Sequence, residues 1–155
     1  MSTPTITISD ITLEQLQAHA GALLQQHYEE LSVDTDAWAL DPDWDNLKKL
    51  ESSGLTHTVG AFVDDEMVGY VGSLFVPRHL HYPFSYVQND VLFVTKEHRS
   101  TSIGGRLMHT VRQWARENGA AQIFWHAKEG TQLHRQLDRV GSRYKLRDII
   151  YSENI

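Results

Sequence analysis

Residues 91–108 read VLFVTKEHRSTSIGGRLM, and this stretch decides the fold because an apolar strand, a polar loop and the start of a long helix follow one another in it. We predict that the strand ends at Val94 and that the helix runs from about Gly104 to Asn118, where apolar residues recur at helical spacing. The first backbone N–H groups of a helix have no acceptor within the helix and carry the positive end of its dipole. Together with Arg99 and the small residues before the helix, they indicate a site for an anion such as phosphate.

The patterns on either side of this stretch predict one α/β (α+β) domain over residues 1–155, with a mixed and mostly antiparallel sheet. A capping box at Thr12 opens the first helix, and His27 shares the apolar row of that helix. The strand–helix–strand unit from 85 to 127 favours a parallel pair of strands. The predicted strands are 5–9, 57–63, 67–76, 85–94, 121–127 and 144–151, and the predicted helices begin near Thr12, Asp41, Gly104 and Thr131.

The composition excludes several classes of site. There are no cysteines, so disulfides, zinc–thiolate sites and a cysteine nucleophile are ruled out, and the nine histidines show no known ligand spacing. We therefore predict no metal. The chain has neither a signal-like N-terminus nor an apolar run of roughly 18 to 20 residues, so we expect a cytoplasmic protein without a membrane span.

The charge is unevenly distributed. The net charge is −6, but residues 1–77 carry −11 and residues 78–155 carry +5. The first half would repel an anion and the second half would attract one, unless the two halves are simply differently charged solvated surfaces. The overall negative charge argues against a nucleic-acid partner, although the basic second half leaves this alternative open.

The predicted anion site is similar to a motif of the GNAT superfamily of N-acetyltransferases, Arg/Gln-x-x-Gly-x-Gly/Ala, which here reads Arg99-x-x-Ser102-x-Gly104. The order of elements also matches that family over almost the whole chain, and residues 40–44 and 78–82 resemble a phage or prophage branch of it. The resemblance implies a central, splayed parallel strand pair and about four helices. It also implies acetyl-CoA as cofactor, with the pyrophosphate held by Arg99, Ser100, Thr101, Ser102, Ile103, Gly104 and Gly105. A bulge would free the backbone of Leu92, Phe93 and Val94 to pair with the pantetheine arm.

Three positions depart from the family pattern. Ser102 stands where glycine is usual, and a serine would be strained there if the position required a positive φ. Leu137 stands where many members have a tyrosine that protonates the leaving thiolate, and Gln88 stands where some relatives have a glutamate base. Two proton-transfer groups that occur in the family are therefore missing from these positions.

A protonated amine must lose a proton before it attacks the thioester, so the site needs a group that can accept one. Asp90 is the best remaining carboxylate, since by period two it shares a strand face with Gln88 and Leu92. His79 and His81 are predicted at the acceptor end of the cleft. His134, His126 or water could take the place of the missing tyrosine. The alternatives are a structural role for Asp90 and a surface position for the histidines.

We expect an acyltransferase that moves an acetyl group to a primary amine of a small molecule or protein by direct attack on the thioester. Five acidic residues lie close together in the sequence: Asp34, Asp36, Asp41, Asp43 and Asp45. They either form a solvated face or attract a cationic amine such as a polyamine, an aminoglycoside or a lysine. Two other functions stay open, namely a non-catalytic coenzyme A-binding module and a phage enzyme that modifies nucleic acid or a host protein. A homodimer is a further expectation.

Overall fold

The computed structural model describes residues 2–32 and 35–155. Its centre is a five-stranded sheet in the order β1-β2-β3-β4-β5, formed by β1 (Ile6–Ile11), β2 (Thr56–Val63), β3 (Glu66–Val76), β4 (Tyr86–Val94) and β5 (Gln122–Phe124). The first four strands are antiparallel, and β5 runs parallel to β4. The predicted mixed sheet with one parallel pair is therefore confirmed.

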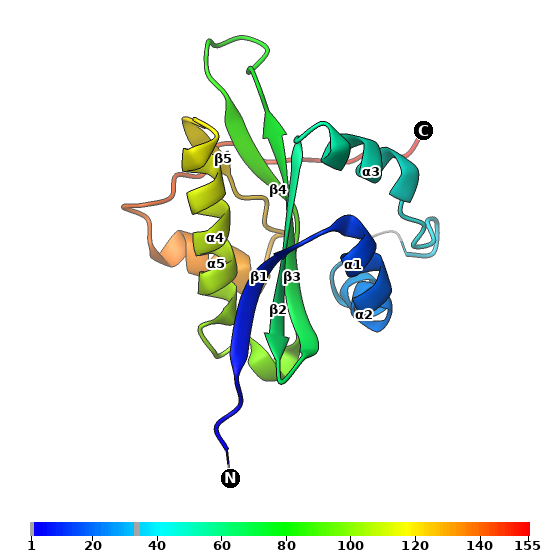
Figure 1. The fold of residues 1–155 in the computed structure, drawn as a ribbon. Coiled ribbons are helices and arrows are strands. Elements are labelled where there is room, and N and C mark those ends of the chain that lie inside the picture. The colour runs from blue at the N-terminus through cyan, green and yellow to red at the C-terminus, as the bar shows by residue number, and fades with distance from the viewer. Residues whose placement is uncertain (1, 33–34) are drawn as a thin grey trace.

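Helices cover both faces of the sheet, as Figure 1 shows. On one face lie α4 (Ile103–Glu117) and α5 (Gln132–Arg139), and on the other lie α1 (Leu13–His19), α2 (Gly21–Leu31) and α3 (Trp44–Ser52). A short 3-10 helix, η1 (Lys96–His98), stands between β4 and α4. Among the described residues, no helix is long and apolar enough to cross a membrane.

The helix starts follow local capping chemistry. Thr12 and Gln15 form the expected capping box at α1. The single helix predicted from Thr12 onward is two helices, because the backbone leaves helical geometry at Ala20, just before the poor helix former Gly21. The third helix begins at Trp44 rather than at Asp41-Pro42, since the Asp43 side chain accepts the N–H of Asn46 at 3.1 Å and so becomes the cap.

Two apolar cores lie on the two faces of the sheet. The α4 core contains the predicted row of Ile103, Leu107 and Val111, all fully buried against β2, β3 and β4. The opposite core packs α1 and α2 over Tyr70 of β3 and Phe93 of β4. Each buried leucine or valine contributes roughly 1.5–3 kcal/mol relative to exposure, so α4 is held firmly in place.

Strand β4 changes course at a bulge. Gly72 of β3 faces Val91, but the next residue, Ser73, faces Asn89, so Asp90 is an extra residue on β4. This is the bulge that the sequence resemblance implied.

Beyond this point β4 and β5 separate, because β5 pairs only with residues 86–88 of β4. The buried side-chain amide of Asn89 spans the opening. It donates to the carbonyl of His126 at 3.1 Å and accepts the N–H of His126 at 2.5 Å. A side chain thus replaces the next rung of the ladder, and β5 is shorter than the predicted 121–127.

The predicted last strand, residues 144–151, is wrong. These residues belong to no strand, and the apolar side chains of their alternating pattern, Leu146, Ile149, Ile150 and Tyr151, are exposed. Within residues 2–32 and 35–155 no strand pairs with the outer side of β5, so the parallel pair lies at the edge of the sheet rather than at its centre.

Candidate active site

The loop between β4 and α4 leaves the start of α4 open. Ser102 has φ −74° and ψ −3°, ordinary helical values, so serine in place of glycine adds no backbone strain. Apart from its chain neighbours and the backbone of its own helix, a Cβ placed on Gly104 or Gly105 would meet no atom within 4 Å. The first turn of α4 is therefore accessible from outside, as an anion site requires.

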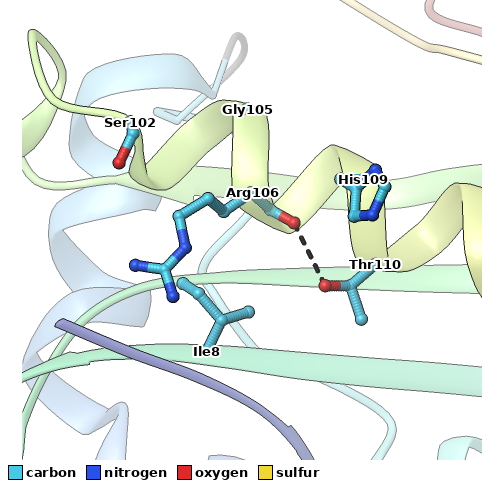
Figure 2. Close-up of a pocket in the computed structure, with 6 residues that line it drawn as sticks. All are labelled: Ile8, Ser102, Gly105, Arg106, His109 and Thr110. Atoms are coloured by element: carbon cyan, nitrogen blue, oxygen red, sulfur yellow. Dashed lines mark hydrogen bonds between the residues drawn. The ribbon is translucent and has the colours of Figure 1, made fainter.

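A groove of about 520 Å³ runs beside this helix start (Figure 2). It is lined by Ser102, Gly105, Arg106, His109 and Thr110 of the loop and α4, and by Ile8 of β1. Figure 2 shows the Arg106 side chain extending from the first turn of α4 over Ile8. Arg106 was not among the predicted site residues, although its place directly after the two glycines was a usable signal.

Arg99 points into the protein. Its Nε donates to the carbonyl of Val94 at 2.7 Å, and its Nη2 forms an ion pair with Glu30 of α2. Its guanidinium carbon lies 5.4 Å from the centre of the Phe93 ring. The residue that the motif assigned to phosphate is engaged by the protein itself.

The bulge also changes which side chains share a face. The period-two prediction placed Asp90 and Leu92 together, but Leu92 packs against the α4 core whereas Asp90 lines a hollow on the α2 and α3 face. The extra residue in the strand reverses the alternation between the two. The prediction of a shared face was wrong for this reason.

This hollow has a volume of about 480 Å³ and three acidic residues in its wall: Asp41, Asp43 and Asp90. The rest of the wall comes from α2, α3 and the segment between them: Tyr28, Ser32, Trp38, Ala39, Leu40, Pro42, Asn46, Leu47 and Leu50. The hydroxyl of Tyr28 lies within hydrogen-bond distance of the carbonyls of Thr35 and Trp38, to which it can donate its one proton, and so fixes the segment beside the hollow. Asp34, from the same acidic run, lies outside the described residues.

The predicted catalytic histidines lie elsewhere. His79 and His81 belong to the loop between β3 and β4, where His79 stacks on Phe84 and its Nδ1 accepts the N–H of His81. In α5, His134 accepts the N–H of Gly130 and lies 3.3 Å from Asp138. None of the three lines the hollow beside Asp90. Over residues 2–32 and 35–155, no group of His, Cys, Asp and Glu is placed to hold a metal ion.

One partly buried histidine was missed. His27 of α2 stacks on Phe93 with ring centres 4.8 Å apart, and its Nδ1 lies 2.7 Å from the hydroxyl of Tyr70. Burial first, and then the positive charges of Lys128 and Arg99, lower the pKa of His27 to about 4, although Glu30 opposes them. Burial raises the pKa of Tyr70. Both groups are therefore uncharged at neutral pH, and the position of His27 in an apolar row was the available signal.

Comparison with known proteins gives one family and many similar folds. The model of the acetyltransferase (GNAT) family matches residues 22–137. Similar solved structures include a transcriptional regulator from Bacillus halodurans C-125, with a TM-score of 0.74, 16% identity, and coverage of 97% of this chain and 100% of the other. An aminoglycoside acetyltransferase from an uncultured soil metagenomic sample has a TM-score of 0.72, 16% identity and 97% coverage of each chain. A ribosomal-protein-alanine N-acetyltransferase from Brucella melitensis biovar Abortus 2308 has a TM-score of 0.68, 20% identity and 97% coverage of each chain. No curated protein matches the sequence.

Proposed function

Because the chain belongs to the GNAT acetyltransferase family, we propose that it transfers the acetyl group of acetyl-CoA to a primary amine. The observation that carries this proposal is the position of β4. At its bulge the strand contributes Asp90 to an acidic hollow, and beyond the bulge it separates from β5 and leads to the open start of α4. One strand thus connects a place for an amine with a place for phosphates.

The residues at the start of α4 fit the coenzyme. In our proposal Ser100, Thr101, Ser102, Ile103, Gly104 and Gly105 surround the pyrophosphate, and Arg106 adds a positive charge. Leu92 and Phe93 offer backbone groups to the pantetheine arm, while the carbonyl of Val94 is already taken by Arg99. When bound, the coenzyme would supply an activated acetyl thioester.

The chain's own residues would prepare the amine. A primary amine is a cation at neutral pH, so Asp41 and Asp43 attract it and a carboxylate oxygen of Asp90 accepts its proton, directly or through one water. Leu137 has no proton for the leaving thiolate, so that proton would come from His134 or from water. His79 and His81 remain predicted contributors from the neighbouring loop.

We propose that the acceptor is a cationic amine, of the kind found in polyamines, aminoglycosides and lysine side chains. Three carboxylates around one hollow favour a substrate with more than one positive charge, and Trp38 at its wall offers an aromatic face to a cation. The similar structures include an aminoglycoside acetyltransferase and a ribosomal-protein-alanine N-acetyltransferase. The amines to be tested therefore include both small molecules and proteins.

The test is the rate of coenzyme A release from acetyl-CoA with a panel of amines that differ only in charge. Asp43→Asn should raise the KM for a dicationic amine about tenfold while leaving a monocation nearly unaffected. Asparagine also caps helices well, so this variant should keep α3 intact. The matched control is Asp45→Asn, two residues along and not part of the hollow. Equal rates across the panel would refute the proposed acceptor.

A second candidate is a coenzyme A-binding module without turnover. It is favoured by Leu137 and Gln88, which replace two proton-transfer groups of the family, and by the contacts that engage His134. Tight coenzyme A binding with no turnover on any amine of the panel would establish it over the transferase.

A further inference from the structure

The contact between Glu30 and Arg99 joins two parts of the molecule that are far apart in sequence. Glu30, on α2, accepts from Nη2 of Arg99 and from Nε2 of Gln26, the latter at 3.2 Å. Arg99 uses its Nε for the carbonyl at the end of β4. One guanidinium therefore fastens the loop that precedes α4 to α2 on one side and to Val94 on the other.

This pair is partly withdrawn from water. The side chains of Arg99 and Glu30 are 26% and 16% exposed, and Phe93 lies beneath the guanidinium. Burial alone would raise the pKa of the Glu30 carboxyl, but the hydrogen bonds from Arg99 and Gln26 and the charge of Arg99 lower it below its usual value. Charge-assisted hydrogen bonds in such surroundings are stronger than those between neutral groups.

The same helix also reaches the acidic hollow. Tyr28 of α2 and Ser32 at its C-terminus line that hollow, and Glu30 stands between them in sequence. The carbonyl of Arg99 is in turn approached by Gln132 at the start of α5, at 3.4 Å. Arg99 is thus held by residues from both faces of the sheet.

We propose that Glu30 is a positioning residue for the coenzyme loop. By holding Arg99 inward it fixes residues 95–102 so that the first turn of α4 stays open to the coenzyme phosphates. This inference rests on the proposed function, since it assumes that the loop binds coenzyme A. A loop that is already ordered loses less conformational entropy on binding, so the contact increases affinity without touching the ligand.

The experiment compares Glu30→Gln with Glu29→Gln and measures coenzyme A binding by calorimetry, with KM and kcat for acetyl-CoA. Glu29 is the matched control because it is the neighbouring residue of the same helix, but it is exposed and bonded only to Gln25 by its side chain within the described residues. We expect Glu30→Gln to weaken coenzyme A binding about tenfold and to raise KM equally with kcat nearly unchanged. Glu29→Gln should behave as the wild type.

A double-mutant cycle with Arg99→Gln separates this role from two others. If Glu30 acts through Arg99, the double variant binds coenzyme A no more weakly than Arg99→Gln alone. If Arg99 instead binds phosphate, Glu30→Gln frees it, binding becomes equal or tighter, and the proposal is overturned. A fall in Tm without a change in affinity would overturn it equally, since that is what a purely structural contact predicts.

Two further results complete the test. If Glu30→Gln does not fold, Arg99→Lys keeps the charge while losing the guanidinium geometry, and we expect an affinity loss of about threefold; unchanged affinity would count against the proposal. If the wild type itself binds no coenzyme A, the proposed function fails, and the positioning role fails with it. If the wild type binds and the Glu30 variants bind equally well, only the positioning role fails.

Discussion

Acidification should destabilise this protein through His27. The pKa of this residue is about 4 in the folded protein and 6.5 without perturbation, so the unfolded chain binds a proton that the folded protein does not. Because the pKa of His27 is lower in the folded protein, its contribution to the free energy of unfolding is present above pH 6.5 and is lost as the pH falls toward 4. With these two values, linkage gives a loss of about 2 kcal/mol between pH 7 and pH 5, and of about 3 kcal/mol in total.

The assay is urea unfolding at pH 7 and pH 5 for the wild type and for His27→Gln, which cannot titrate and keeps a polar partner for Tyr70. The wild type should lose about 2 kcal/mol more than the variant between the two pH values. His19→Gln on α1, where the histidine is exposed, is the control and should retain the wild-type slope. If wild type and His27→Gln lose stability in parallel, His27 is not held neutral by burial and the reasoning is wrong.

Three other changes test the rest of the fold and the site. Asn89→Ala removes both hydrogen bonds to His126 and should cost about 2–3 kcal/mol in urea unfolding, whereas a loss below about 0.5 kcal/mol would show that the bridge between β4 and β5 is not needed. Leu107→Ala, in the fully buried row of α4, should cost about 2–5 kcal/mol, and a smaller loss in thermal unfolding would contradict the tight packing described for that core. Arg106→Gln should weaken coenzyme A binding about five- to tenfold at low salt and less at high salt, while Arg116→Gln near the far end of α4 should have no effect; equal binding by both would exclude Arg106 from the phosphate site.

Much of the fold could be predicted because its signals are local. The capping box at Thr12, the hairpin turn at Asp64-Asp65, and the glycines with positive φ after α3 and α4 each depend on a few neighbouring residues. The apolar row of α4 likewise specifies one buried helix face without reference to the rest of the chain. The capping box and the apolar helix row, which the sequence analysis predicted, were confirmed.

The predictions that failed depended on contacts with distant parts of the chain, which a local sequence pattern does not specify. Residues 144–151 alternate like a strand, but a strand also needs a neighbour and a layer that covers its apolar side, and the fold provides neither. Asp90 and Leu92 have the spacing of one face, but the bulge depends on how β4 registers against β3.

The sequence by itself determined that a strand, a loop of small residues and a glycine-opened helix follow one another from residue 91 onward, because hydrophobic period and backbone freedom act over a few residues. Only the tertiary structure decided what that segment offers to a ligand. Arg99 turns inward because Glu30 reaches it from α2, and Asp90 turns toward the acidic hollow because of its pairing register. Charge pairs and strand registers form between distant segments, so their outcome depends on the packing of the whole chain.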